Sequence, residues 1–287
     1  MAVNLMKPVS LNSALAAAVK AARAAGKIML ANWHKPKRVN SAEAHDIKLE
    51  LDVRCQALIE KILAAAFPQI PVLGEEGSTG DTTAEYRWVI DPIDGTVNYF
   101  YGMPHACVSI ALEKRDECCV TSEKKNARRK SVHASRITHH ASVVAVIYDP
   151  FTDELWTTTK GQPTRLNGKI IRVSNRTKLN DCVIAMGFSK SADNLKKSLP
   201  HLIRISKQAK KIRIMGSAAL ELAYVASGRL DAYIERTINL WDVAAGSLLV
   251  ENAGGEFYTL PGPNGKLRMC ADNGKLRKKL QIGSLLK

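Results

Sequence analysis

A short apolar run that ends in two aspartates constrains this chain more than any other stretch. Residues Trp88–Ile90 are followed at once by Asp91-Pro92-Ile93-Asp94-Gly95-Thr96. A buried strand that ends in acids carries its carboxylates to the edge of a sheet, where α/β folds place ligands. Pro92 stiffens this turn, and Gly95 permits close backbone approach before a helix start whose N–H groups attract anions. The stretch therefore predicts a site for a cation beside a phosphate.

Two other segments place acids directly after an apolar run. Glu75 and Glu76 follow a strand predicted at 71–74, and Asp242 lies at the start of a helix predicted at 241–252. For any one of these acids alone, a solvent-facing cap is the simpler interpretation. If the fold gathers them, their charges repel, and divalent cations relieve the repulsion. All-oxygen ligands without Cys or His favour Mg²⁺, Mn²⁺ or Ca²⁺ over Zn²⁺.

Such a site predicts hydrolysis without a protein nucleophile. Two ions bridged by a shared aspartate hold both the attacking and the leaving oxygens of a phosphoryl displacement, and they lower the pKa of a bound water. A metal-activated water then cleaves the ester.

Alternating helices and strands predict an α/β fold in layers. Helices are predicted at 11–32 (capped by Ser10), 47–67, 192–210, 217–226 and 241–252, and strands at 71–74, 88–90, 106–112, 142–148, 154–158, 182–187, 212–215 and 230–235; Asn167-Gly168 predicts a tight hairpin. We expect an N-terminal lobe, 1–175, that carries the Glu-Glu and Asp-Pro-Ile-Asp-Gly-Thr motifs, and a C-terminal lobe, 176–287, that carries the Trp-Asp motif. Because no linker composition separates the lobes, they are expected to share one core.

Residues 114–141 interrupt this pattern. They contain eight Lys or Arg against three Asp or Glu, a local net charge of +5, and few large apolar residues. This composition predicts a mobile basic loop inserted into a hairpin. The whole chain carries a net charge of +15, which suits nucleic acid, acidic lipid or an anionic substrate, and equally a solvated surface.

The chain has the composition of a cytoplasmic protein. No apolar run approaches the roughly 18 residues of a membrane span. Lys20, Arg23 and Lys27 interrupt the Ala-rich stretch at 1–31, which favours a surface helix over a signal peptide. The six cysteines lack metal-ligand spacing, as expected of reduced cytosolic thiols.

Three motifs resemble the signatures of the inositol monophosphatase family, which belongs to the Mg²⁺-dependent, lithium-sensitive phosphatase superfamily. They are Gly74-Glu75-Glu76, Asp91-Pro92-Ile93-Asp94-Gly95-Thr96-Val97-Asn98-Tyr99 and Trp241-Asp242-Val243-Ala244-Ala245-Gly246. The similarity runs from about residue 10 to 260, interrupted at 114–141. It implies the layered αβαβα sandwich of the inositol monophosphatase and fructose-1,6-bisphosphatase type. It also implies a phosphomonoesterase that acts on inositol monophosphate or a similar small polyol phosphate.

The resemblance further implies a ligand set for two or three Mg²⁺ ions, with Mn²⁺ as an alternative. Glu75, Asp91 and the Ile93 carbonyl would hold the first ion. Asp91, Asp94 and Asp242 would hold the second, and Glu75 could touch a third.

By the same resemblance, Thr96 and Glu75 orient the attacking water, and the amides of Gly95 and Thr96 receive the phosphate. Asp52 supports the water and the threonine, although the segment before it, 46–51, departs from the family pattern. Positions that bind the alcohol hydroxyls are matched by Gly216, Ser217, Ala218 and Glu235. A carboxylate accepts two hydroxyl hydrogen bonds, which suits a polyol; the alternative for Glu235 is a surface acid at a strand end.

Other functions remain open on the same residues. A sugar bisphosphatase or a 3′-phosphonucleotide phosphatase would use the same metal core with a different alcohol pocket. An RNA-linked regulatory role would use the basic residues at 114–141 and 266–279. Members of the family are commonly homodimers, and His105 is either structural or at the mouth of the site.

Overall fold

The computed structural model describes residues 9–43, 46–123, 132–188 and 192–281. The helices are α1 (Leu11–Asn32), α2 (Glu50–Ala66), α3 (Thr96–Phe100), α4 (Ala192–Ser206), α5 (Ala218–Ala226), α6 (Leu240–Asn252) and α7 (Arg277–Leu280). The strands are β1 (Val39–Glu43), β2 (Asp46–Leu49), β3 (Val72–Gly74), β4 (Gly77–Thr79), β5 (Tyr86–Asp94), β6 (Cys107–Glu123), β7 (Val132–Asp149), β8 (Glu154–Thr159), β9 (Arg165–Leu166), β10 (Lys169–Ile170), β11 (Val183–Met186), β12 (Lys211–Arg213), β13 (Ala232–Ile238), β14 (Glu256–Pro261) and β15 (Leu267–Asp272).

Two large sheets carry the fold. The first has eight strands in the order β10-β9-β8-β7-β6-β5-β3-β4, and the second has five in the order β12-β11-β13-β15-β14. Neighbours in the first sheet are antiparallel except for β3 and β5. In the second, β12, β11 and β13 are parallel, and β15 and β14 run antiparallel to their neighbours.

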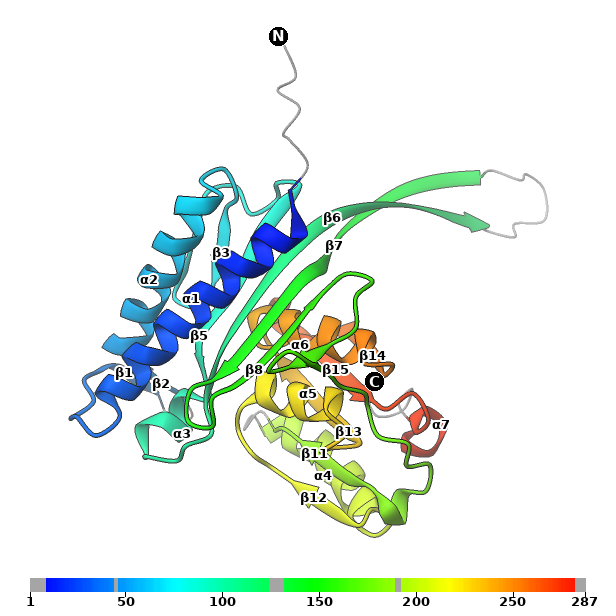
Figure 1. Ribbon diagram of the computed structural model, residues 1–287. Coiled ribbons are helices and arrows are strands. Elements are labelled where there is room, and N and C mark those ends of the chain that lie inside the picture. Colours follow the sequence, from blue (N-terminus) through cyan, green and yellow to red (C-terminus); the bar gives the residue numbers. More distant parts are fainter. Residues whose placement is uncertain (1–8, 44–45, 124–131, 189–191, 282–287) are drawn as a thin grey trace.

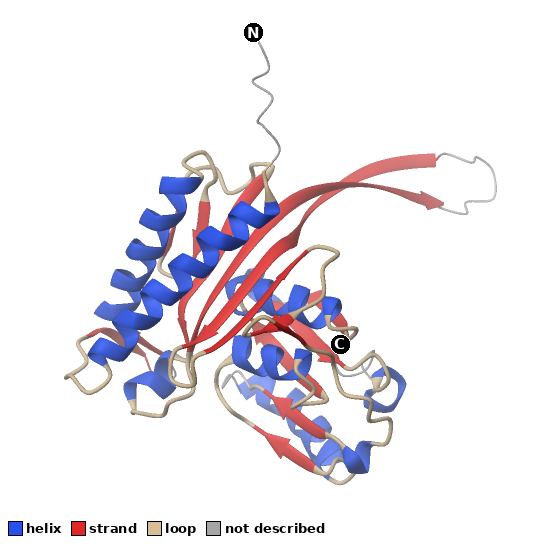
Figure 2. Cartoon of the chain, viewed as in Figure 1, coloured by secondary structure: helices blue, strands red, loops and turns tan. Residues whose placement is uncertain are grey.

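Helices and sheets alternate in five layers, which confirms the predicted αβαβα sandwich (Figures 1 and 2). Helices α1 and α2 cover the outer face of the first sheet, and α5 and α6 fill the space between the sheets. Helices α4 and α7 cover the outer face of the second sheet. The middle cluster of buried side chains takes members from both sides of residue 175, among them Val89, Trp156, Leu222 and Tyr233.

The first predicted helix is confirmed, whereas the second begins later than predicted. Ser10 caps α1 by accepting the Ser13 N–H at 3.4 Å. Helix α2 begins at Glu50 rather than at Ile47, because residues Asp46–Leu49 pair with β1 as strand β2. The Asp52 carboxylate accepts the Leu49 N–H at 2.7 Å and so caps the helix at this later start.

The prediction of a mobile loop at 114–141 is wrong for the described residues. Strands β6 and β7 continue through 114–123 and 132–141 in one register that runs from Lys114↔Ala141 to Glu123↔Val132; residues 124–131 lie outside the described part of the chain. Pairing with β5 ends at Lys114, and pairing with β8 ends at Val144. A two-stranded arm therefore projects from the sheet (Figure 1). Val, Ile, Thr and Cys residues on both sides favour strands, and ladder pairing outweighs the high charge.

The other predicted helices and strands are present, with ends that differ from the predicted ones. Asn167 and Gly168 form the turn between β9 and β10 with φ angles of 47° and 81°, as predicted for an Asn-Gly hairpin. Strands β14 and β15 were not predicted. In the described ranges, none of the helices has the length and apolar character needed to span a membrane.

Candidate active site

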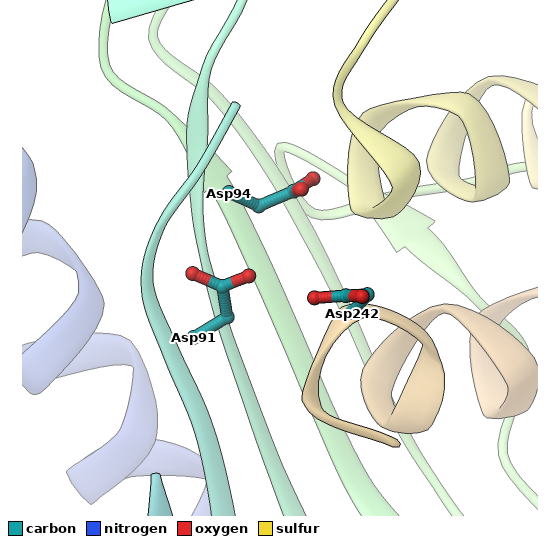
Figure 3. Close-up of side chains that lie close together, drawn as sticks. All are labelled: Asp91, Asp94 and Asp242. Atoms are coloured by element: carbon teal, nitrogen blue, oxygen red, sulfur yellow. The ribbon is translucent and has the colours of Figure 1, made fainter. Parts of the chain in front are cut away.

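Three aspartates from two elements meet at one end of the first sheet. Asp91 and Asp94 lie at the end of β5, and Asp242 lies in the first turn of α6; a carboxylate oxygen of each lies within 4.8 Å of the other two (Figure 3). Residues three apart on a regular strand point to opposite faces. Between Asp91 and Asp94, however, the β5–β6 register shifts. This irregularity re-aims the strand and brings both carboxylates to the same place.

Helix α5 holds the Asp94 carboxylate at its N-terminus. The Ser217 hydroxyl donates to Asp94 Oδ2 at 2.6 Å, and the Ala219 and Ala218 amides donate at 2.7 and 3.2 Å. Burial raises the pKa of Asp94, and these hydrogen bonds oppose the rise. Ser217 and Ala218 are expected from the sequence to bind substrate hydroxyls. In the structure their donor groups bind a carboxylate of the cluster. Sequence analysis did not identify Ala219, because its contribution is a backbone amide, which nearly any residue type at this position of the helix would offer.

Asp242 and Glu75 complete a crowded acidic site. Burial, then repulsion from Asp94, raises the pKa of Asp242 to about 7. Glu75 follows β3, which runs parallel to β5, and its N–H donates to the Ile90 carbonyl at 3.2 Å, which places it beside Asp91. Burial, then repulsion from Asp242, raises the pKa of Glu75 to about 8. Burial and the neighbouring acids, Glu75 first, raise the pKa of Asp91 well above its usual range.

Gln56 of α2 supports the Glu75 segment and was not singled out by the sequence. Its Oε1 accepts the Glu76 N–H at 2.9 Å, and its Nε2 donates to the Gly77 carbonyl at 3.0 Å. A Cβ atom on Gly74 would lie 2.4 Å from Gln56 Oε1, so glycine is needed for this contact. Gln56 is 5% exposed; the signal available in the sequence was a polar residue at helical spacing from Ile59 and Leu63.

The turn after Asp94 places Thr96 beside the acids. The Thr96 hydroxyl donates to the Ile93 carbonyl at 2.8 Å, so the expected metal-ligand carbonyl is paired with the expected water-positioning hydroxyl. Gly95 has a φ of 90°, and a Cβ there would lie 2.8 Å from the His105 carbonyl oxygen. Asp52 lies close enough to repel both Glu75 and Asp91, which places it beside the cluster.

Glu235 is buried at the same end of the fold and is not a surface acid. It is 8% exposed, and it accepts a hydrogen bond from the Tyr233 hydroxyl at 2.8 Å. Burial raises its pKa to about 8, with added repulsion from Asp242 and Asp94. A side chain at Gly187 would collide with this carboxylate, its Cβ lying 1.4 Å from Oε2.

Asn98 fixes the backbone that precedes α5. Its Nδ2 donates to the carbonyls of Met215 at 2.8 Å, His105 at 2.9 Å and Gly216 at 3.2 Å. Gly216 is exposed with a φ of 80°. His105 therefore contributes its backbone here, while its ring packs against Tyr224 at a centroid distance of 5.9 Å and burial lowers its pKa.

The donor set fits a hard divalent cation. The acids that converge are carboxylates, the oxygen ligands that Mg²⁺ prefers. The Cys107 thiol lies 3.8 Å from Asp94, but burial, then the neighbouring acids, raises its pKa well above its usual range, which disfavours the thiolate needed for Zn²⁺. Raised carboxylate pKa values mean that the charges are uncompensated within the protein. A cation would compensate them.

Comparisons with known proteins agree with this architecture. The model of the inositol monophosphatase family matches residues 10–122 and 131–281. The chain is 40% identical over 247 residues to Nus factor SuhB of Xylella fastidiosa, covering 85% of this chain and 81% of that protein. It is 34% identical over 271 residues to inositol monophosphatase 2 of Solanum lycopersicum, covering 91% of this chain and 93% of that protein. The crystal structure of extragenic suppressor protein suhB from Bartonella henselae matches with a TM-score of 0.81 and 32% identity, covering 96% of this chain and 99% of that one.

Proposed function

The chain belongs to the inositol monophosphatase family, and from that premise we propose that it is a Mg²⁺-dependent phosphomonoesterase for inositol monophosphate or a similar small polyol phosphate. The observation that carries the proposal is the meeting of Asp91, Asp94 and Asp242, with Glu75 beside Asp91 at the end of the neighbouring strand. Buried carboxylates this close favour divalent cations over an empty site.

We assign these four carboxylates as ligands of two or three Mg²⁺ ions, which Mn²⁺ can replace. When bound, such ions would stabilise charge on the phosphoryl group and acidify a water molecule. The Ile93 carbonyl is a further candidate ligand. Sensitivity to Li⁺ is part of the proposal.

The chain's own residues would orient the reactants. Thr96 holds its hydroxyl beside the acids through its hydrogen bond to Ile93, which supports a role with Glu75 in orienting the attacking water. The amides of Gly95 and Thr96, at the start of α3, would receive the phosphate. Asp52, which repels Glu75, supports this network from α2.

The residues expected to contact the alcohol support a polyol leaving group. Glu235 is a buried acceptor near the acids, and carboxylates accept two hydroxyl hydrogen bonds. Gly216 offers exposed backbone before α5, and Ser217 and Ala218 would act mainly through Asp94. A sugar bisphosphatase or a 3′-phosphonucleotide phosphatase would share the metal core, so the identity of the alcohol is the open choice.

Phosphate release from a panel of esters tests the proposal. Inositol 1-phosphate, fructose 1,6-bisphosphate and adenosine 3′,5′-bisphosphate are offered with Mg²⁺, with excess EDTA, and with Mg²⁺ plus Li⁺. We expect the fastest turnover on inositol 1-phosphate, none after chelation, and inhibition by Li⁺. Equal activity after exhaustive chelation would refute the metal mechanism, and preference for either bisphosphate would refute the substrate class.

We further propose a cytoplasmic homodimer whose lobes, 1–175 and 176–287, share the core between the two sheets. The cluster that joins Val89 and Trp156 to Tyr233 supports a shared core. Light scattering after size-exclusion chromatography tests the dimer, because a mass of one chain would contradict it.

A second candidate is an RNA-linked role, favoured by the name Nus factor SuhB that several relatives carry. The net charge of +15 and the basic segment 114–141 supply the charge that polyanions need; five of the eight Lys or Arg residues of this segment lie at 124–131, outside the described residues. Binding of single-stranded RNA measured across a salt titration tests this role. Affinity that is absent, or that does not fall with salt, would remove it.

A further inference from the structure

A chain of three buried polar side chains lies beside the carboxylate cluster. Glu221 of α5, Tyr233 and Glu235 of β13 are 1%, 2% and 8% exposed. The Tyr233 hydroxyl donates to Glu235 Oε2 at 2.8 Å, and a second hydrogen bond links it to the Glu221 carboxyl group. Tyr233 therefore joins the two glutamates.

Glu221 also holds the segment that leads into α5. Its Oε1 accepts the Met215 N–H at 2.9 Å, and it takes a second backbone hydrogen bond from Gly216. Asn98 binds the carbonyls of the same two residues at 2.8 and 3.2 Å. The N–H and carbonyl groups of Met215 and Gly216 are thus all hydrogen-bonded, next to the donors that bind Asp94.

The Tyr233 hydroxyl is shared by the two glutamates. A tyrosine hydroxyl carries one proton and donates to one carboxylate at a time. Tyr233 donates to Glu235 at 2.8 Å, and hydrogen bonding to the same hydroxyl opposes the rise that burial causes in the pKa of Glu221. Two bare carboxylates so close in a buried place would be unfavourable, and burial raises the pKa of each glutamate to about 8. Tyr233 lies between the two glutamates, and its hydroxyl proton fixes the position of the Glu235 carboxylate.

We propose that Glu221 is a positioning residue for substrate selection: through Tyr233 it fixes the Glu235 carboxylate and so favours esters whose leaving group carries hydroxyls. This inference rests on the proposed function, because it concerns recognition of the alcohol at the same site. Glu221 and Tyr233 are not among the residues that would receive the phosphate. Their effect is therefore on recognition of the alcohol more than on the hydrolytic step.

The Tyr233→Phe variant tests the middle of the chain. It keeps the ring and removes the hydroxyl, so the KM for inositol 1-phosphate should rise about tenfold with little change in kcat, as for loss of a hydrogen bond to a charged group. On p-nitrophenyl phosphate, whose leaving group has no hydroxyl for Glu235, the KM should stay near its wild-type value. Tyr258→Phe on β14 is the matched control, because Tyr258 lies in the same sheet and stacks under Arg277.

Glu221→Gln and Glu221→Leu test the end of the chain. Glutamine keeps an acceptor for the two amides and a donor for Tyr233, so the ratio of kcat/KM between the two substrates should remain that of the wild type. Leucine has similar size and neither function, so this ratio should fall about tenfold. Melting temperatures identify a variant that fails to fold; if the leucine variant does, Glu221→Gln and Tyr233→Phe still decide.

Two outcomes would overturn the inference while leaving the phosphatase intact. One is an equal loss on both substrates in Tyr233→Phe. The other is a Glu221→Gln variant that loses the preference for inositol 1-phosphate. A wild-type protein that does not prefer the polyol ester would instead refute the proposed substrate class, and the inference with it.

Discussion

The Ser217 hydroxyl donates a 2.6 Å hydrogen bond to the Asp94 carboxylate, although 123 residues separate them in the sequence. The bond joins the end of β5 to the start of α5. It also favours the ionised form of the carboxylate, since hydrogen bonds to the charged form oppose the rise in pKa caused by burial. An ionised, fixed Asp94 is what a cation needs.

Ser217→Ala should therefore weaken metal activation more than substrate binding. The Mg²⁺ concentration for half-maximal activity should rise about tenfold, as expected for losing a hydrogen bond to a charged group. Ser206→Ala, at an exposed position of α4, serves as the control. A higher KM for the phosphate ester with unchanged Mg²⁺ dependence would show that Ser217 contacts substrate instead.

Asp91→Asn should abolish turnover and yet stabilise the metal-free protein. Asp91 is buried among acids that raise its pKa, so a neutral side chain of the same shape removes repulsion. We expect a higher melting temperature in EDTA and loss of the increase that Mg²⁺ gives the wild type. The exposed Asp181→Asn should behave as wild type. A variant that Mg²⁺ still stabilises fully would remove Asp91 from the ligand set.

The metal-free protein should lose stability as the pH rises from about 4 to 8. The pKa is raised to about 8 for Glu75 and about 7 for Asp242 in the folded protein, whereas the unfolded chain releases these protons near pH 4. The folded state thus binds more protons across this window, and the free energy of unfolding falls with pH. Urea unfolding in EDTA at pH 5 and pH 8 measures it.

Mg²⁺ should oppose this loss, because deprotonated carboxylates bind metal best. The stabilisation by saturating Mg²⁺ should be larger at pH 8 than at pH 5. Equal stabilisation at both values would argue against a metal held by these carboxylates.

Thr96→Ala should keep the metal and lose about 10² to 10⁴ in kcat, the range typical of a lost proton-handling or water-orienting group. The hydroxyl that binds Ile93 is the group removed. Thr96→Ser keeps that hydroxyl and should retain most of the activity. Mg²⁺-induced thermal shifts confirm that the site still binds. Normal turnover in the alanine variant would refute the water-positioning role.

Replacing residues 116–139 by Asn-Gly should leave catalysis intact. Arg115 and His140 face each other across the β6–β7 ladder, so a two-residue turn can join them. Pairing with β5 ends before this point, and the sheet keeps its inner strands. We expect unchanged kcat/KM and weaker salt-dependent RNA binding. A variant that cannot fold would show that the arm stabilises the sheet.

Local sequence carried much of the fold. The Ala-rich pattern with Ser10 before it predicted α1, and Asn167-Gly168 predicted the β9–β10 turn, because caps and turns depend on neighbours in the chain. The same reasoning failed at Ile47 and at 114–141, where pairing with another strand outweighed local preference.

The acidic residues of the site could be identified from the sequence, because they directly follow apolar runs that are typical of buried strands. Their meeting point was not, since it depends on β3 lying beside β5, on the register shift after Asp91 and on α6 packing across the sheet. Residue types name the chemistry that a chain can offer. Long-range packing selects which groups share a few ångströms, as Ser217 does with Asp94, and that selection turns separate acids into a site.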